Sequence, residues 1–315
     1  MKVIFIGCGY LGMNLSGQLR EAATVQTIGL PGPYAPYCAD FLAVDAFDER
    51  DLDRVDFRDA VVVDTISLLP NNAKSDDEDA MLQRIGQRYS FLLQQLKQRE
   101  AAQLVFLSSG GTVYGNAQQP ICEEAPLHPV SLYARSKVLC EQLIQNSGLP
   151  WLILRLANPY GGYQLTNKRQ GVIPTAIEKI LAHEEFEMWA SPYSSRDYLY
   201  IDDFAQALRL LLRRRIVNQI VNIGSQQATS LDQILGIIQR QTGLALAIRH
   251  IQSEVPLVDQ IVLDIGKLRR LTGFEVRVSL EEGIAREISR IRAQRKGIVG
   301  GQRGLKEEGI RQRQP

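Results

Sequence analysis

Residues 2–12 read KVIFIGCGYLG, a short apolar run with glycines following at positions 7, 9 and 12. The run has the length and β-branched character of a buried strand, and a helical pattern follows it. In this G-x-G-x-x-G spacing Gly7 permits a tight turn, Gly9 lets the backbone approach a pyrophosphate, and Gly12 lets helix pack on strand. The stretch predicts a dinucleotide-binding turn; the alternative is a glycine turn with a structural role only.

The alternation of strand-like and helix-like segments continues beyond this unit. Five further apolar runs of strand length lie at 24–30, 40–44, 60–67, 103–109 and 151–157. Segments with helical periodicity lie between them, at 10–21, 77–99 and 131–146. This alternation predicts an α/β fold: a Rossmann-type, doubly wound parallel sheet with helices on both faces.

The chain is less regular after the sixth strand-like run. Helical patterns near 173–183, 203–214, 230–242 and 279–292 are separated by Gly and Pro. We expect a Rossmann domain over 1–165. We expect 166–292 to form most of a smaller C-terminal substrate-binding domain, interleaved with the first. Residues 293–315 carry six Lys or Arg against two Glu and predict a basic, flexible tail.

Composition narrows the possible classes of function. The 315 residues are 45% hydrophobic and 23% charged with a net charge of +1, so no global field attracts nucleic acid or an acidic membrane. No apolar run approaches the roughly 18 residues of a membrane span, and the start lacks a signal-peptide pattern, which predicts a cytoplasmic protein.

The four cysteines, Cys8, Cys38, Cys122 and Cys140, form no CxxC pair and are expected to be reduced thiols. The three histidines have no ligand spacing, so no metal site is expected.

The residues around the predicted turn bear on the choice of cofactor. Tyr10 and Leu11 begin the helix after the turn and are predicted cofactor contacts. The second strand ends TIGLPGP, without the acid that would hold the ribose 2′-OH of NAD or the Arg that would accept the 2′-phosphate of NADP. This contact favours neither cofactor. Asp45, after the third strand, can reach the adenine, or it only caps a turn.

The stretch YARSK places Tyr133 and Lys137 four residues apart on a predicted helix, and hence on one face. Free tyrosine has a pKa of about 10, and a nearby ammonium or a cationic nicotinamide favours the phenolate. Lys137 can also hold the nicotinamide ribose hydroxyls. The pair predicts a catalytic acid/base with its partner; the alternative is a surface pair.

Together these motifs resemble the extended short-chain dehydrogenase/reductases, in particular the NAD-dependent sugar-nucleotide epimerase/dehydratase family, over roughly residues 1–292. The resemblance is closest to UDP-hexose 4-epimerases. It rests, in this order, on GCGYLG, LSSGGTVYG, YARSK, ILRLANPYG, GVIP, RDYLYIDD, VNIGS and DIGKLRRLTGFEVRVSLEEGIARE. It implies NAD as cofactor, a nucleotide sugar, UDP-linked, as substrate, and roles for Tyr133 as acid/base and Lys137 as its partner.

The resemblance also implies how the substrate is held. Asn158 and Arg196 would bind the diphosphate, which suits the planar guanidinium of Arg, and Val172 and Ile173 would lie near the nucleotide base. The alternatives are a capping Asn and a salt-bridged surface Arg.

The family also implies a homodimer through the helices near 77–99 and 131–147. These helices carry more leucines than packing on one face of the sheet requires, namely Leu92, Leu93, Leu96, Leu139 and Leu143. The alternative is that all five leucines face the sheet.

One position departs from the family pattern. Gly110, followed by Gly111, stands where the family has Ser or Thr. We expect Thr112, or as second choice Ser109, to supply the missing hydroxyl.

Relatives that dehydrate the sugar have an Asp-Glu pair where this chain has Gly111 and Thr112, so dehydration is disfavoured. A sugar-nucleotide C4 epimerase fits best. The alternatives are an NAD(P)H-dependent 4-keto-6-deoxyhexose nucleotide reductase and a dinucleotide-binding protein without catalysis.

Overall fold

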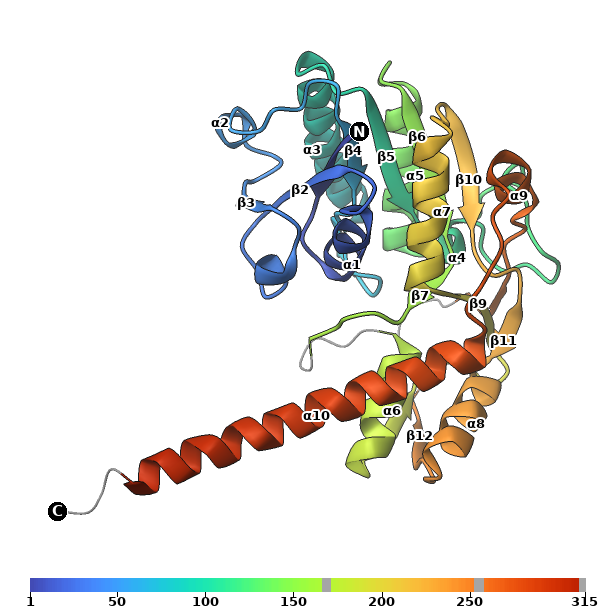
Figure 1. Ribbon diagram of the computed structural model, residues 1–315. Helices are drawn as coiled ribbons and strands as arrows, with labels where there is room; N and C mark the ends of the chain where they lie inside the picture. The colour runs from blue at the N-terminus through green and yellow to red at the C-terminus, as the bar shows by residue number, and fades with distance from the viewer. Residues whose placement is uncertain (166–170, 252–257, 312–315) are drawn as a thin grey trace.

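The computed structural model describes the backbone of residues 1–165, 171–251 and 258–311, with side chains up to residue 296. A sheet of seven parallel strands forms its centre (Figure 1), in the order β10-β6-β5-β4-β1-β2-β3. The chain therefore starts near the middle of the sheet and winds outward in both directions. The strands are β1 (Lys2–Ile6), β2 (Thr24–Gly29), β3 (Phe41–Ala43), β4 (Val61–Asp64), β5 (Gln103–Ser108), β6 (Trp151–Leu156) and β10 (Gln219–Ile223).

Helices cover both faces of this sheet (Figure 1). Successive side chains of a strand point to opposite faces of the sheet, so the residues of β1 alternate between two hydrophobic cores. Val3 and Phe5 belong to the core under α1 (Tyr10–Leu19) and α7 (Ile201–Arg213). Ile4 and Ile6 belong to the core under α3 and α5. The other helices of this layer are α2 (Glu49–Leu52), α3 (Glu78–Gln98), α4 (Gly110–Val113), α5 (Leu132–Gln145) and the 3₁₀ turn η1 (Ala35–Tyr37).

A smaller layer lies beyond the carboxyl ends of the strands (Figure 1). One of its sheets has the order β11-β9-β13, with β7 also paired to β9, and a second joins β8 to β12. Its strands are β7 (Asn158–Tyr160), β8 (Phe186–Met188), β9 (Ser195–Tyr200), β11 (Ala228–Ser230), β12 (Ile248–His250) and β13 (Gln260–Ile261). Its helices are α6 (Val172–Ala182), α8 (Leu231–Thr242) and α10 (Leu280–Arg311), whereas α9 (Gly266–Thr272) packs beside α7 and β10 of the large sheet.

The predicted fold class is confirmed. All six predicted strands are present in one parallel sheet, and helices lie at each predicted helical segment. The chain enters the smaller layer with β7 and returns to the large sheet with α7 and β10, a seventh strand that we did not predict. Because the chain crosses between the two layers, residues of both layers border the space between them.

We predict a flexible tail over residues 293–315, and most of this stretch is helical; its flexibility stays a prediction. Helix α10 continues to Arg311, and its far end extends away from the rest of the protein (Figure 1). Nine of the 19 residues in 293–311 are Gln, Arg, Lys or Glu, which have high helix propensity, and five are Gly, which has low propensity. Residues 312–315 lie outside the described part. Neither α10 nor any other described helix is long and apolar enough to cross a membrane.

The leucines offered for a dimer contact do not support it. Leu92, Leu93 and Leu96 are buried in the core between α3 and the sheet, as the alternative interpretation expected. Leu139 and Leu143 pack partly against the same core. The homodimer stays a prediction.

The start of α10 is part of the main core. Ile284, Ile288 and Ile291 are at most 3% exposed and share one cluster with α6, α7 and α8. Ile288→Ala should therefore lower the free energy of unfolding by about 2–5 kcal/mol, the usual cost of such a cavity. Urea unfolding measures this, with Arg292→Ala, an exposed position of the same helix, as the matched control. Equal stability of the two variants would contradict the docking of α10.

Candidate active site

A cavity of about 1570 Å³ lies between the two layers. One wall is formed by the loops that follow β1, β2, β4, β5 and β6, and the other by α6, β8 and β9. In α/β folds of this type, ligands bind outside the carboxyl ends of the strands. The cavity is therefore the candidate active site, and we call it the cleft.

Each glycine of the predicted turn has its own structural role. Gly7 has a φ of +105°, which favours glycine. A Cβ on Gly12 would lie 2.0 Å from the Gly7 carbonyl oxygen, whereas a Cβ on Gly9 would meet no atom within 4 Å. Gly9 also precedes α1 without a side-chain cap, so the first N–H groups of the helix stay free for an anion. The turn therefore fits a pyrophosphate.

The other predicted cofactor contacts also line the cleft. Tyr10 and Leu11 do so at the start of α1, and the Tyr10 hydroxyl donates to the Gly161 carbonyl at 2.7 Å. Asp45 lines the cleft as well, and its carboxylate accepts a hydrogen bond from the Phe47 N–H at 2.9 Å. Asp45 thus caps a turn and also faces the predicted adenine end, so both interpretations of this residue fit.

The prediction that all four cysteines are thiols is wrong for one pair. Cys8, inside the phosphate-binding turn, forms a disulfide with Cys38, and Cys122 and Cys140 remain free. Thirty residues separate Cys8 from Cys38, but β2 returns the chain to the turn and brings their Cα atoms within 6.6 Å. The described residues contain no group of three or more His, Cys, Asp or Glu side chains that could hold a metal ion.

Tyr133 and Lys137 both line the cleft, from one face of α5. Ser131 starts this helix by accepting a hydrogen bond from the Ala134 N–H. Lys137 is buried, its Nζ donates to the Leu107 carbonyl at 2.9 Å, and it lies 5.9 Å from the centre of the Tyr133 ring. An ammonium is therefore fixed beside the phenol, as the YxxxK spacing predicts.

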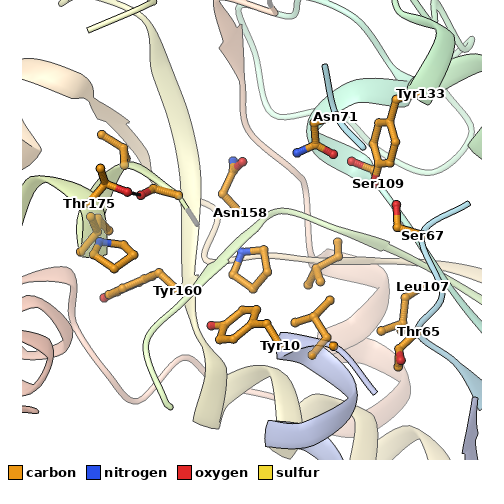
Figure 2. A pocket seen from close by; sticks show the side chains of 18 of the residues that line it. Tyr10, Thr65, Ser67, Asn71, Leu107, Ser109, Tyr133, Asn158, Tyr160 and Thr175 are labelled. Atoms are coloured by element: carbon orange, nitrogen blue, oxygen red, sulfur yellow. Dashed lines mark hydrogen bonds between the residues drawn. The ribbon is translucent and has the colours of Figure 1, made fainter. Parts of the chain in front are cut away.

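Of the two candidate hydroxyls in this loop, that of Ser109 opens on the cleft and that of Thr112 does not. Ser109 lines the cleft, and Figure 2 shows its side chain pointing toward Tyr133 and Asn71. Thr112 does not line the cleft, and its hydroxyl donates back to the Ser109 carbonyl at 3.4 Å. Ser109, our second choice, is therefore favoured over Thr112, our first choice, as the residue that supplies the hydroxyl.

The structure also explains Gly110. A Cβ at this position would lie 2.6 Å from a methyl carbon of Leu263 and 3.0 Å from the Arg155 carbonyl oxygen. Leu263 is fully buried and belongs to the smaller layer, so no side chain at position 110 fits without moving it. A Ser or Thr at position 110 would therefore have to displace the Leu263 side chain and crowd the Arg155 carbonyl oxygen.

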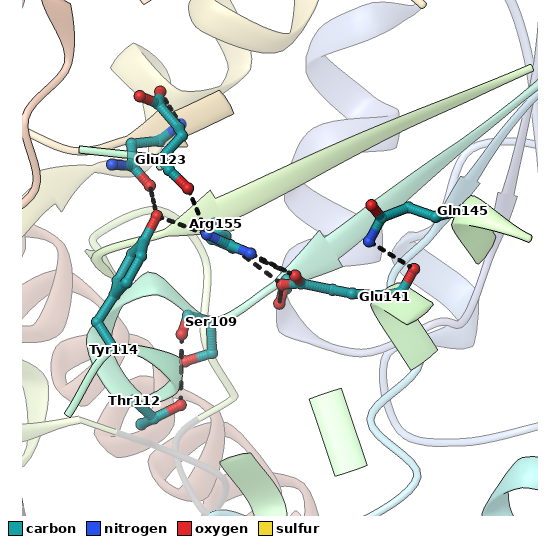
Figure 3. Close-up of polar contacts among 9 residues, drawn as sticks. Ser109, Thr112, Tyr114, Glu123, Glu141, Gln145 and Arg155 are labelled. Carbon is teal, nitrogen blue, oxygen red and sulfur yellow. Dashed lines mark hydrogen bonds and ion pairs between the residues drawn. The ribbon is translucent and has the colours of Figure 1, made fainter. Parts of the chain in front are cut away.

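A buried polar network holds this loop against α5 (Figure 3). Arg155 and Glu141, 3% and 1% exposed, form an ion pair at 2.7 Å. Glu141 also accepts from Ser108, and the Arg155 guanidinium donates to the Tyr114 hydroxyl at 2.9 Å. Burial alone would lower the pKa of Arg155, but the bonds and charge of Glu141 raise it above its ordinary value. Both ends of the SSGGTVY loop are therefore tied to one charged pair.

The predicted substrate residues face the cleft from its other wall. Asn158 lies in β7 and donates to the Asp197 carbonyl at 2.9 Å. Arg196, in β9, makes no ion pair with any described residue, which contradicts the salt-bridged alternative; burial lowers its pKa from the ordinary value. Val172 and Ile173 start α6 and border the same space. The cleft thus brings a cation without a described carboxylate partner to the side opposite Tyr133.

Many residues that line the cleft were not predicted from the sequence, and three of them have side chains that suit ligand binding. These three are Asn71, after β4, Trp189, which is 51% exposed, and Arg249, paired with Glu185 at 2.7 Å. Of these, only Trp189 could have been recognised from the sequence. It stands in the loop-like stretch WASPYSS, just before RDYLY, where no strand or helix pattern would bury a large aromatic side chain. Asn71 and Arg249 stand in segments without a motif.

The comparisons with known proteins agree with this geometry. A model of the NAD-dependent epimerase/dehydratase family matches residues 7–224. A Methanocaldococcus jannaschii protein named "Putative UDP-glucose 4-epimerase" is 30% identical over 304 residues, 92% of this chain and 97% of that protein. The dTDP-4-dehydro-6-deoxyglucose reductase of Escherichia coli is 30% identical over 230 residues, 72% of each chain. The UDP-glucose 4-epimerase of Thermus thermophilus, solved with NAD, has the same fold (TM-score 0.84, 24% identity, 93% of this chain and 99% of that one).

The buried network generates a prediction about stability. Arg155→Met leaves Glu141 as an uncompensated buried charge and should lower the free energy of unfolding by about 3–5 kcal/mol. The double variant Arg155→Met/Glu141→Met should recover much of this loss, because no charge then stays unpaired. Urea unfolding measures both. Arg58→Met, which breaks the exposed pair with Glu100, is the control and should change little. A double variant less stable than Arg155→Met would contradict the argument.

Proposed function

The chain belongs to the NAD-dependent epimerase/dehydratase family, and on that premise we propose that it is a C4 epimerase of nucleotide sugars. The proposed substrates are UDP-linked hexoses, and the proposed reaction inverts the configuration at C4. The observation that carries the proposal is the convergence on one cleft of Tyr133, Lys137 and Ser109 on one side and Arg196 on the other. The predicted NAD cofactor agrees with the family.

The cofactor end of the cleft fits this reaction. The free N–H groups at the start of α1 and the open side of Gly9 would hold the pyrophosphate, and Asp45 would face the adenine. Lys137 would hold the nicotinamide ribose. When bound there, NAD would supply the redox chemistry, as acceptor and then donor of a hydride at C4.

The protein's own part in the chemistry is to move one proton. Tyr133 takes the proton from the hydroxyl on C4 as the hydride leaves, and gives it back when the hydride returns. Lys137, held by the Leu107 carbonyl, favours the phenolate through its positive charge. Ser109 donates a hydrogen bond to the same sugar oxygen, in the role that Gly110 cannot fill.

The other wall of the cleft would hold the rest of the substrate. Arg196, with no carboxylate partner among the described residues, would bind the diphosphate, and Asn158 would contact it beside β7. Val172, Ile173 and the half-exposed Trp189 border the space where the nucleotide base would lie. With the diphosphate fixed there, the hexose is free to turn between Tyr133 and the cofactor, as inversion at C4 requires.

A reductase of 4-keto-6-deoxyhexose nucleotides is the second candidate. One observation favours it: β2 ends at Gly29 without a charged residue for the ribose, which suits a cofactor that exchanges in each cycle. The similarity to the reductase of Escherichia coli points the same way, over a smaller share of the chain. A dinucleotide-binding protein without catalysis is the third candidate, and the Tyr133→Phe assay below separates it from both enzymes.

Activity provides the first test. Purified protein with NAD should interconvert UDP-glucose and UDP-galactose, or their N-acetyl forms, and Tyr133→Phe should abolish turnover while NAD still binds, because only the proton transfer is lost. Chromatography of the nucleotide sugars measures turnover, and calorimetry measures NAD binding. No interconversion of any of these sugars would contradict the epimerase. Oxidation of NADPH by a 4-keto sugar nucleotide would support the reductase instead.

The second test compares two hydroxyls of one loop. Ser109→Ala should lower turnover by about 10²- to 10³-fold, the usual cost of removing a donor to a reacting oxygen. Thr112→Val, the matched control, should change turnover little, since its hydroxyl donates to the Ser109 carbonyl outside the cleft. Steady-state kinetics on the assay above measures both. A large loss in Thr112→Val with full activity in Ser109→Ala would reverse the assignment.

A further inference from the structure

The disulfide lies inside the cofactor site. Cys8 stands between Gly7 and Gly9 in the phosphate-binding turn, is partly exposed and lines the cleft. Its partner Cys38 is buried, 7% exposed, beside Met13 and Tyr34. A covalent bond therefore joins the turn that would hold the pyrophosphate to the segment that follows β2. We call residues 30–38 of that segment the β2 loop.

Noncovalent contacts also hold the β2 loop, because Tyr34 and Cys38 are buried and pack in one cluster with Met13 of α1. The loop's backbone hydrogen bonds, such as Ala35 N–H to the Gly32 carbonyl, join only residues of the loop itself in the described chain. Outward, the Tyr34 hydroxyl accepts from the Leu165 N–H at 3.3 Å, and the Tyr37 ring lies 5.0 Å from that of Tyr163. The disulfide is thus the strongest link between this loop and the phosphate-binding turn.

The β2 loop forms the wall of the cleft next to the ribose position. Leu30 and Tyr34 line the cleft there, and no charged residue directly follows β2 to hold a ribose hydroxyl. Binding to this wall then depends on its shape, and a wall fixed before binding loses less conformational entropy when the ligand arrives. We propose that Cys8 and Cys38 form a reversible thiol-oxidation site, and that the disulfide form binds the dinucleotide more tightly than the dithiol form.

The proposed oxidant is a low-molecular-weight disulfide, for which glutathione disulfide is the probe. The Cys8 thiolate, which opens on the cleft, attacks one glutathione sulfur and releases one glutathione thiolate. The Cys38 thiolate then attacks the Cys8 sulfur and releases the second. Two cysteine thiols lose two electrons and two protons, and one glutathione disulfide becomes two glutathione thiols. Burial raises the pKa of the Cys140 thiol to about 12, so it does not compete at neutral pH.

Thermodynamic linkage makes the proposal quantitative. If the disulfide raises the affinity for NAD by some factor, bound NAD must favour the disulfide over the dithiol by the same factor. This inference depends on dinucleotide binding and not on the sugar reaction. A chain that binds NAD but inverts no sugar would keep it and lose the epimerase proposal.

The experiment uses Cys122→Ser as the parent, which removes the exposed free cysteine. Its NAD dissociation constant is measured by calorimetry in the disulfide and the dithiol form, with each form verified by thiol alkylation and mass spectrometry. The dithiol form should bind at least about fivefold more weakly. In glutathione redox buffers, saturating NAD should shift the thiol–disulfide equilibrium constant by the ratio of the two dissociation constants. Cys38→Ser in the same parent should bind NAD as the dithiol form does under reducing conditions, and with glutathione disulfide its Cys8 should form only a mixed disulfide with glutathione, never an internal one.

Three results would overturn the proposal. They are equal NAD affinity in the two forms, tighter binding by the dithiol form, and failure of the pair to oxidise in glutathione disulfide. Should Cys38→Ser fail to fold, the comparison of the two forms of the parent still decides, because it needs no change at position 38. A lower melting temperature of the dithiol form with unchanged NAD affinity would make the disulfide purely structural.

Discussion

The ion pair between Arg155 and Glu141 is the constraint on which the candidate active site depends. Both side chains are almost fully buried, and a buried charge must be paired and hydrogen-bonded. The pair meets this need by joining β6 to α5 and by accepting and donating bonds at Ser108 and Tyr114. Tyr133, Lys137 and Glu141 are spaced by four residues on α5, so fixing Glu141 also fixes the face that carries the other two.

The same network extends to β10, the edge strand of the large sheet. The Tyr114 hydroxyl donates to the Asn222 side chain in β10, and the Asn222 N–H donates to Glu123. Leu263, from the smaller layer, fills the space above Gly110. The loop that carries Ser109 is therefore shaped from three sides: by α5, by the returning strand β10 and by the smaller layer. The packing of Leu263 against position 110 is consistent with Gly where the family has Ser or Thr.

Much of this was predictable, because long segments with strong periodicity identify their own structure. The six predicted strands and the helix that carries Tyr133 and Lys137 lie where the sequence places them. Strands of two or three residues in the smaller layer, such as β8 and β13, are too short to have a period. The choice of Ser109 over Thr112 depends on the direction of two side chains, and the Cys8–Cys38 bond depends on a loop that returns to the turn. The helix in 293–311 was missed because its glycines resemble those of a flexible tail.

The proposed reaction requires that a hydride leave C4 of the sugar and return to the same carbon within one cleft. The most direct measurement uses UDP-glucose that carries deuterium at C4, incubated with the protein and NAD in ordinary water. The account predicts UDP-galactose that keeps the deuterium at C4, as read by mass spectrometry and NMR. Product that has lost the deuterium to solvent, or no product at all with every UDP-hexose tried, would contradict it.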